Sequence, residues 1–336
     1  MLNFGKKNRE KQKNKRLGFE TIREKSLDVS SLFSSYWGHQ NHPQVRSLRL
    51  REKNIIANLL SSAVKSEFDY FNNSNPQLLE KMVLDGYVEI PKLFAADDAN
   101  KVRENFEDID DCVAHHVWAP DKQQIKISRP LNITQGAFHG HHVVNNQTLM
   151  NVFLNEKVLD LIEGYLGAPA RLFHLNTMCS FASKNLGGAQ QYHRDNSHPA
   201  FCVLFAYLNE VGLKNGPQEI FKSTHNIESF NKVYTDLDSK LFFDLQNDSY
   251  GFDAFLESNL DKNKVVITGA PGTCFLSDPR GIHRGVPVES HRRWLAWARY
   301  ALIPDDRVIP KFDVDYEYIK DLSHRQLYAI SSIVNY

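Results

Sequence analysis

The chain has 336 residues, of which 42% are hydrophobic and 24% are charged, as is ordinary for a soluble globular enzyme. Lys and Arg together number 40, and so do Asp and Glu, which excludes a strong overall attraction to nucleic acid or to an anionic membrane. The longest apolar run, Phe201 to Leu208, is far too short to span a bilayer as a helix. We therefore expect neither a nucleic-acid partner nor membrane insertion.

The four cysteines are scattered and show no C-x-x-C spacing, which argues against a zinc knot and against a disulfide framework. The N-terminus lacks the apolar stretch of a secretory signal. Both observations favour a reducing compartment, and we expect a cytoplasmic protein.

The first part of the chain is expected to differ from the rest. Residues 1–20 are rich in Lys and Arg, and between Phe4 and Arg16 they have almost no apolar side chains, so we expect a basic, flexible N-terminus rather than a packed one. Residues 21–77 are expected to form a helical extension, because apolar residues recur at helical spacing within 48–64.

The next segment combines helical and turn signals. Residues 78–94 read as a short helix, a turn at Asp85-Gly86 and a strand that ends at Pro91. Asp97-Asp98 can cap a helix that runs to about residue 109. Residues 112–150 are rich in His, Asn and Gln and are predicted to be irregular, whereas 153–166 has the pattern of an amphipathic helix.

From residue 171 onward the pattern becomes that of a β protein. Short β-favouring runs, separated by Gly, Pro and Asn turns, predict an antiparallel sandwich or barrel; they cover 171–182, 190–192, 201–208, 218–221, 264–268, 273–277 and 293–303. We assign residues 78–304 to one β domain with flanking helices. A polar insertion, 226–261, is a candidate lid, and residues 305–336 are expected to be a helical tail with a helix at 322–334.

A candidate metal site stands out in this β region. His193-Arg194-Asp195 is an H-x-D step predicted at the end of a strand, where residues two apart face the same side. A second histidine, His283, follows the strand and turn of residues 272–282. Two histidines and one carboxylate, with the other coordination positions open, are typical of non-haem Fe(II) oxygenases.

Arg293 adds a candidate co-substrate contact. It opens the apolar run RWLAWARYALI, and a buried arginine needs an anionic partner. A bidentate bond to the distal carboxylate of 2-oxoglutarate would supply it. The adjacent Arg292 is the alternative, but alternation places Arg293, Trp297 and Arg299 on one strand face.

Together these motifs resemble the phytanoyl-CoA dioxygenase-like family of Fe(II)/2-oxoglutarate-dependent oxygenases, over roughly residues 81–302. The resemblance rests on five segments in order: DGYVEIPKLF at 85–94, the H-x-D step, the Asn215-Gly-Pro217 turn leading to Ser223-Thr-His225, residues 269–283, and Arg293. The family usually has Gly-Ser-His where this chain has Ser-Thr-His.

The resemblance implies a double-stranded β-helix, or jelly-roll, with helices packed on one sheet, and the use of Fe(II), 2-oxoglutarate and O2. It also suggests Asn176 as a polar contact to 2-oxoglutarate. Halogenating relatives replace the carboxylate ligand with a small residue; because Asp195 is present, the expected reaction is hydroxylation of a small molecule with release of succinate and CO2.

Several side chains near these motifs are candidates for a substrate pocket: Asn196, His198, Trp297 and Arg299. A cationic pocket around Arg299 would favour an anionic or carrier-linked substrate, such as a carboxylate, phosphate or CoA derivative. A turn role is equally open for Asn196 and His198, and a core role for Trp297.

Other polar residues are expected to be structural. The FHGHH segment, with His139, His141 and His142, lacks a cysteine or carboxylate at zinc spacing and reads as a polar loop. His225 is expected to orient a turn, and Arg280 and Arg284 are expected to be solvated loop charges.

Three other functions stay open from the sequence. The same iron site could catalyse desaturation, cyclisation or epimerisation, since the outcome depends on where the substrate carbon lies. The fold could instead be a non-catalytic module that binds 2-oxoglutarate or another ligand. An oxygenase acting on nucleic acid is suggested only by the basic N-terminus and is disfavoured by the neutral total charge.

Overall fold

The computed structural model describes residues 75–109, 112–114, 124–125, 127, 134–183, 188–195, 198, 201–237, 260–302, 304 and 309–335. The expected basic N-terminus and nearly all of the helical extension lie outside these ranges, as does most of the 226–261 insertion. None of the helices in the described ranges has the length and apolar character that crossing a membrane requires.

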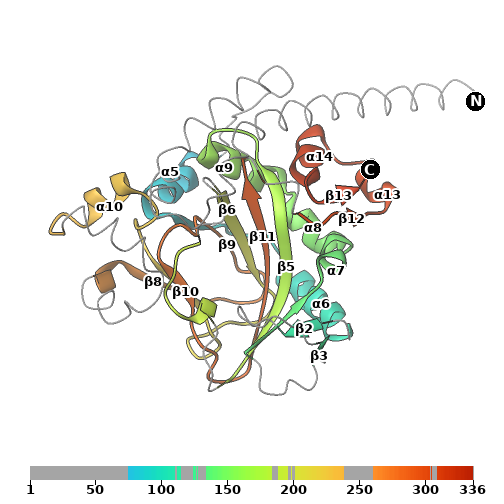
Figure 1. The fold of residues 1–336 in the computed structure, drawn as a ribbon, viewed down its shortest axis with the longest axis horizontal. Helices are drawn as coiled ribbons and strands as arrows, with labels where there is room; N and C mark the ends of the chain where they lie inside the picture. The colour runs from blue at the N-terminus through green and yellow to red at the C-terminus, as the bar shows by residue number, and fades with distance from the viewer. Residues whose placement is uncertain are drawn as a thin grey trace, which may run out of the picture.

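Two antiparallel sheets form the centre of the molecule (Figure 1). The larger sheet has eight strands, in the order β1 (Tyr87–Glu89), β9 (Cys274–Ser277), β6 (Phe201–Tyr207), β11 (Arg292–Ala301), β5 (Arg171–Phe181), β4 (Gln135–Phe138), β2 (Cys112–Ala114) and β3 (Gln124–Ile125). The smaller sheet has three strands, in the order β10 (His283–Gly285), β7 (Gln218–Phe221) and β8 (Lys264–Ile267).

Helices cover the side of the larger sheet that faces away from β7, β8 and β10 (Figure 1). They are α5 (Pro76–Asp85), α6 (Ala96–Glu107), α7 (Gly140–Val144), α8 (Gln147–Phe153), α9 (Glu156–Leu166) and α14 (His324–Ile330). Helix α10 (Ile227–Val233) lies near the smaller sheet, and α13 (Tyr316–Ile319) lies near α14 (Figure 1). Two turns of 3-10 helix, η1 (Gly188–Gln190) and η2 (Asp261–Asn263), precede the metal-site turn and β8.

Local sequence explains where the best-defined helices begin and end. In α9 the side chain of Asn155 accepts a hydrogen bond from the amide of Lys157, and Gly167 ends the helix with a left-handed φ of 85°. In α5 the Asn75 side chain caps the first turn, and Pro76 stands at a first-turn position that needs no amide hydrogen. The predicted helix, turn and strand of residues 78–94 are therefore confirmed as α5, Gly86 and β1.

Alternation along the strands separates two hydrophobic cores. The larger core lies between the helices and the eight-stranded sheet and includes Trp294, Ala296 and Tyr300 of β11. The smaller core lies between the two sheets and includes Leu295 and Trp297 of the same strand. The jelly-roll with helices on one sheet, expected from the sequence, is confirmed, and the space between the sheets holds the candidate site.

Some predicted elements were wrong. Residues 112–150 were expected to be irregular, yet they include β2, β3, β4, α7 and α8, and the FHGHH segment begins α7. Their polar composition hid the fact that all four residues of β4 are buried by pairing with β5 and β2. The predicted strand at 190–192 is instead the end of η1 followed by an isolated bridge at His193.

The C-terminal tail packs on the helical side of the molecule. Its two short strands, β12 (Phe312–Asp313) and β13 (Val334–Asn335), pair in parallel, so the helix predicted at 322–334 ends earlier, at Ile330. Arg325 of α14 forms ion pairs with Glu163 at 3.0 Å and with Asp160 at 3.5 Å, which join the tail to α9. Several of its apolar residues, including Leu327 and Ile330, belong to the larger core.

Candidate metal and co-substrate site

Three candidate metal ligands converge between the sheets. One ligand atom from each of His193, Asp195 and His283 lies within 4.8 Å of the others. The two histidines are joined by their main chains, since each amide donates to the other's carbonyl at 3.0 Å. The amide of Asp195 donates to the carbonyl of Pro279 at 2.8 Å. The structure thus brings together the three residues that the sequence selected, and the main chain fixes their relative positions.

The ring orientation of both histidines suits metal binding. Nδ1 of His193 lies 2.8 Å from the carbonyl of Gln191, and Nδ1 of His283 lies 2.9 Å from the carbonyl of Gly281. Because a carbonyl can only accept, each Nδ1 must carry the proton, which leaves the Nε2 lone pair as the ligand. Nε2 of His193 is 3.7 Å from Oδ1 of Asp195. This donor set fits a divalent ion such as Fe(II).

The electrostatic environment keeps these groups in their metal-binding forms. Burial, together with the neighbouring His193, lowers the pKa of His283 to about 4, so its imidazole is neutral. Burial on its own would raise the pKa of Asp195, but neighbouring groups, the Arg299 guanidinium foremost, outweigh it and hold that pKa below its usual value. Asp195 is therefore a carboxylate at neutral pH.

Arg299 forms a hydrogen bond with Asp195, one of the three candidate metal ligands. Its Nη2 donates to Oδ2 of Asp195 at 3.0 Å, whereas Oδ1 is the oxygen that faces His193. The guanidinium therefore holds one carboxylate oxygen and leaves the other for the metal. The sequence placed Arg299 in a substrate pocket; its side chain does line the cavity, but part of its hydrogen-bonding capacity belongs to Asp195.

A cavity of about 210 Å³ extends from the three ligands toward Arg293. Its walls combine apolar side chains, among them Met178, Phe205, Leu295 and Trp297, with a few polar ones. This combination is typical of a small-molecule site, in which apolar walls exclude water and polar groups fix orientation.

Arg293 lies at the cavity as a buried cation without an acidic partner. Its side chain is 2% exposed, and its two terminal nitrogens donate to the carbonyl of Gly216 and to Oγ of Ser180. Among the described residues no carboxylate forms an ion pair with it, and Nε has no hydrogen-bond partner. Burial lowers its pKa. An anionic ligand such as the distal carboxylate of 2-oxoglutarate fits this environment.

The surroundings of the two adjacent arginines favour Arg293 over Arg292 as the contact for the 2-oxoglutarate carboxylate. The guanidinium of Arg292 lies over the ring of Phe181, with 5.3 Å to the ring centroid, and is not among the groups that line the cavity. Gly285 of β10 faces Arg293, and a Cβ atom there would lie 3.0 Å from Nη1 of the arginine. The absence of a side chain at this position makes room for the guanidinium.

Two glutamines line the cavity beside Arg293 but were not predicted from the sequence as site residues. Gln135 of β4 pairs with Ser180 of β5, which in turn pairs with Arg293 of β11, so the three side chains form one row across the sheet. Gln218 of β7 approaches from the opposite sheet, and both glutamines line the cavity. Gln135 could have been found only if residues 135–138 had been predicted as a strand, and their composition does not favour one.

The remaining predicted site residues differ in how they relate to the cavity. Asn176 is on the same face of β5 as the site and pairs with Trp297, and its Oδ1 is buried with no hydrogen-bond partner among the described residues. The ring of His198 lies against that of Phe173, tilted by 42°, with a centroid distance of 4.0 Å. Trp297 lines the cavity and donates from Nε1 to Nδ1 of His174 at 3.3 Å. Asn196 lies outside the described residues.

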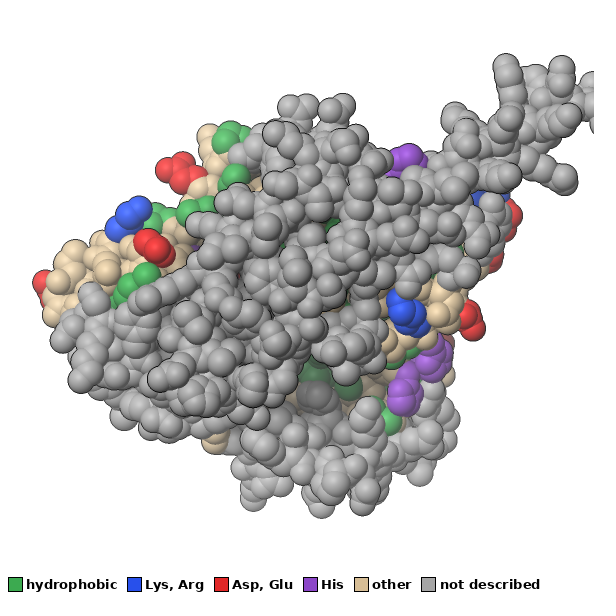
Figure 2. Space-filling model, turned by 45° about the horizontal axis from the view of Figure 1, so that its top comes forward, with side chains coloured by type: hydrophobic (Ala, Val, Ile, Leu, Met, Phe, Trp, Pro, Cys, Tyr) green, Lys and Arg blue, Asp and Glu red, His purple; other side chains and the backbone are tan. Residues whose placement is uncertain are grey.

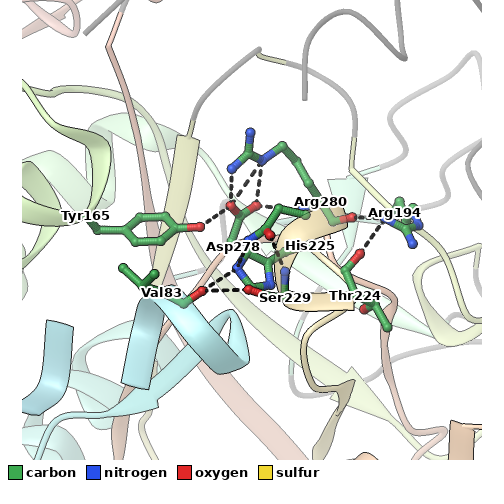
Figure 3. Close-up of polar contacts among 9 residues, drawn as sticks. Val83, Tyr165, Arg194, Thr224, His225, Ser229, Asp278 and Arg280 are labelled. Atoms are coloured by element: carbon green, nitrogen blue, oxygen red, sulfur yellow. Dashed lines mark hydrogen bonds and ion pairs between the residues drawn. The ribbon is translucent and has the colours of Figure 1, made fainter. Parts of the chain in front are cut away.

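The expectation of solvated loop charges at Arg280 and Arg284 was wrong. Arg280 is buried and forms several bonds to the carboxylate of Asp278 (Figure 3), and Arg284 pairs with Glu219 at 2.7 Å. His225 is buried, with Nε2 3.1 Å from the carbonyl of Val83 (Figure 3). The expected structural role of His225 agrees with this position.

Histidine side chains are also exposed on one side of the molecule (Figure 2). At the start of α7 the ring of His139, the N-cap residue of the helix, stacks on that of His141, with centroids 5.9 Å apart, and His141 is exposed. These histidines are not among the side chains that converge at the candidate metal site.

The fold and the site together define an oxygenase that uses Fe(II) and 2-oxoglutarate. The sequence profile of the phytanoyl-CoA dioxygenase (PhyH) family matches residues 82–294, and the chain belongs to this family. The matched region includes the three ligands and Arg293. The protein is thus an Fe(II)/2-oxoglutarate-dependent dioxygenase, as the sequence motifs predicted.

Solved structures with a similar fold are distant in sequence. The non-heme alpha ketoglutarate dependent epimerase SnoN from nogalamycin biosynthesis is 14% identical, with a TM-score of 0.45 over 67% of this chain and 81% of that one. EctD from S. alaskensis, with 2-oxoglutarate and 5-hydroxyectoine, is 16% identical, with a TM-score of 0.45 over 69% and 78%. HygX from Streptomyces hygroscopicus, with nickel and 2-oxoglutarate bound, is 13% identical, with a TM-score of 0.42 over 68% and 87%. No curated protein sequence matches the chain. These identities are too low to indicate a shared substrate.

Proposed function

We propose that the protein hydroxylates an unactivated C–H bond of a small-molecule substrate. His193, Asp195 and His283 would hold the iron, and Arg293 would hold the distal carboxylate of 2-oxoglutarate. The observation that carries this proposal is the presence, in one cavity, of three converging ligands and a buried arginine with no acidic partner among the described residues.

When bound, iron and 2-oxoglutarate supply the oxidation, in which O2 gives one oxygen atom to succinate, with loss of CO2, and the other to the substrate. The chain's own residues position these groups. Arg299 binds Oδ2 of Asp195, which would leave Oδ1, the oxygen nearer His193, to hold the metal. Met178, Leu295 and Trp297 exclude water from the cavity. Asn176 remains a proposed polar contact to 2-oxoglutarate.

Hydroxylation is favoured over halogenation because Asp195 occupies the position that a halide would need. Desaturation, cyclisation or epimerisation at the same iron is the alternative outcome, and a non-catalytic module that binds 2-oxoglutarate or another ligand is the alternative function. The binding module is disfavoured because a protein that had lost its catalysis would have no physical need to keep three metal-binding side chains and Arg293 converging in one buried site, which is energetically costly.

For the substrate we propose an anionic or carrier-linked small molecule. The candidate contacts are Trp297 and Arg299 at the cavity, together with Asn196 and His198 in the segment that follows Asp195. A cytoplasmic location is proposed as well, because all four cysteines are buried thiols.

The proposed limits of the catalytic domain remain residues 78–304, with 226–261 as an insertion and 305–336 as a tail. The basic N-terminus, 1–20, and the extension, 21–77, would precede it.

The test is an anaerobic titration with Fe(II) followed by 2-oxoglutarate, in which the metal-to-ligand charge-transfer absorption band is recorded. Wild type is compared with His193→Ala and Arg293→Ala, and Arg292→Ala is the matched control because it removes the adjacent arginine, which does not line the cavity. We expect a band in wild type and in the control, no band in His193→Ala, and a band in Arg293→Ala only at much higher 2-oxoglutarate concentration.

Two results would contradict the proposal. Folded, iron-treated wild type that gives no band would leave the binding-module alternative. A band lost in Arg292→Ala but kept in Arg293→Ala would move the carboxylate contact to the neighbouring arginine. Once the band is established, succinate release in the presence of candidate substrates, anionic and neutral, identifies the substrate class.

A further inference from the structure

Arg194 lies between two candidate ligands in the chain, yet its side chain is directed into the interior, where it is 6% exposed. Its Nη1 donates to two main-chain carbonyls, that of Thr224 at 2.6 Å and that of Arg280 at 2.7 Å (Figure 3). One nitrogen of one side chain therefore connects the His193–Asp195 segment to two other segments of the chain.

Both segments lead to the third ligand. Arg280 belongs to the turn between β9 and β10, and His283 follows it by three residues. Thr224 follows β7, and its hydroxyl accepts a hydrogen bond from the amide of Ile282 at 2.8 Å while donating to the carbonyl of Phe221 at 2.8 Å. The contacts of Arg194 thus continue, through Thr224, to the residue directly before His283.

The turn that Arg194 contacts is itself held by the helical layer. The guanidinium of Arg280 binds the carboxylate of Asp278, and the hydroxyl of Tyr165 in α9 donates to Oδ2 of the same carboxylate at 2.5 Å (Figure 3). The amide of Asp278 donates to the carbonyl of Gly86 at 2.8 Å. Burial alone would raise the pKa of Asp278, but Arg280 outweighs it and holds the pKa at about 2, so the carboxylate stays charged.

We propose that Arg194 is a positioning residue for the metal: it fixes the His193–Asp195 segment against the turn that carries His283, and so sets the geometry of the ligand triad. The proposal rests on the metal site of the proposed function. Arg194 touches neither metal nor substrate in this role; it acts through the backbone of the residues that do.

A purely electrostatic role for Arg194 makes the opposite prediction. Removing a positive charge from the neighbourhood of a dication would by itself strengthen metal binding. Losing a group that orients the ligands weakens metal binding, typically by 10- to 100-fold. Because the two effects have opposite signs, the direction of the change in Fe(II) affinity distinguishes them.

The experiment measures the Kd for Fe(II) by anaerobic equilibrium dialysis of the full chain. Arg194→Met removes the hydrogen bonds and the charge, and Arg194→Lys keeps the charge and one donor nitrogen. Arg325→Met is the matched control, because Arg325 forms ion pairs on the helical side of the molecule. We expect Arg194→Met to raise the Kd by about 10-fold or more, Arg194→Lys to recover part of that loss, and the control to bind iron as wild type does.

A milder variant covers the case in which Arg194→Met does not fold. Thr224→Val is nearly isosteric and removes only the hydroxyl that holds Ile282; we expect its Kd to rise several-fold, with the near-ultraviolet circular dichroism of wild type. Iron affinity in folded Arg194→Met that equals or exceeds that of wild type overturns the proposal, as does unchanged affinity in Thr224→Val if only that variant folds. Wild type that binds no iron overturns the metal site itself, and this inference with it.

Discussion

The two faces of β11 differ in how their polar groups are satisfied. On the helix side the hydroxyl of Tyr300 donates to the carbonyl of Phe153 at 2.7 Å, and its neighbours on that face are apolar. On the cavity side, Nε of Arg293 has no partner among the described residues, and Arg299 binds a metal-ligand carboxylate. Both faces are largely buried, so burial alone does not distinguish them. The distinguishing feature is whether the protein itself completes the hydrogen bonding or leaves part of it to a ligand.

Because neighbouring residues of β11 lie on opposite faces, we expect substitutions only one residue apart to have different consequences. Changes on the helix face should lower the free energy of unfolding and leave ligand binding intact. Changes on the cavity face should impair function with a smaller effect on stability. Three measurements test this separation.

The largest expected effect is on the cavity side, at Asp195. Asp195→Ala removes a proposed metal ligand and the partner of Arg299, so succinate formation should fall to the level measured without enzyme. The thermal midpoint should change little, because the main chain, rather than the carboxylate, joins this segment to Pro279. Full activity in a folded Asp195→Ala protein would exclude Asp195 as a ligand.

The next effect separates two tryptophans of the same strand. Trp294 is 2% exposed in the larger core, whereas Trp297 is 8% exposed and lines the cavity. Trp294→Ala should lower the free energy of unfolding by about 3–5 kcal/mol, measured by chemical denaturation, with an unchanged KM for 2-oxoglutarate at a temperature where the variant is folded. Trp297→Ala should cost less stability, because the cavity already lies on one side of its ring. Equal destabilisation by both would show that the two faces do not differ in this way.

The smallest effect concerns Gly285. An alanine Cβ at this position would lie 3.0 Å from Nη1 and 3.1 Å from Nη2 of Arg293, so Gly285→Ala should displace the guanidinium. We expect the KM for 2-oxoglutarate to rise about 10-fold, which corresponds to about 1.4 kcal/mol, with a smaller change in kcat. The control is Gly164→Ala in α9, whose Cβ would meet only Leu79, at 3.4 Å. If both variants keep the wild-type KM, Gly285 is not needed to accommodate Arg293.

The sequence alone predicted the parts of the site that have short-range signatures. The H-x-D step, the histidine after a strand and turn, and the arginine that opens an apolar strand each combine a residue type with a spacing, and the structure brings all four side chains to one cavity. Most strands after residue 171 were predicted close to their observed limits, because apolar runs between Gly, Pro and Asn turns are a local signal.

The parts that could not be predicted depend on contacts between distant segments. Gln135 lies in a strand that is buried only because β4 pairs with β5 and β2. Arg280 looks like a loop charge until Asp278 and Tyr165, from a turn and a helix far apart in the chain, are seen to surround it. The side chain of Arg194 likewise gives no sequence signal, since its partners are main-chain carbonyls. A single sequence does not reveal tertiary burial of this kind.

The reciprocal main-chain hydrogen bonds between His193 and His283 hold these two residues together through the backbone, with no part played by the metal-binding nitrogens. The entropy of closing the long chain segment between them is therefore lost when the protein folds, not when iron binds. We therefore expect iron binding to cost less chain entropy here than metal binding costs a zinc finger, which folds only around its ion.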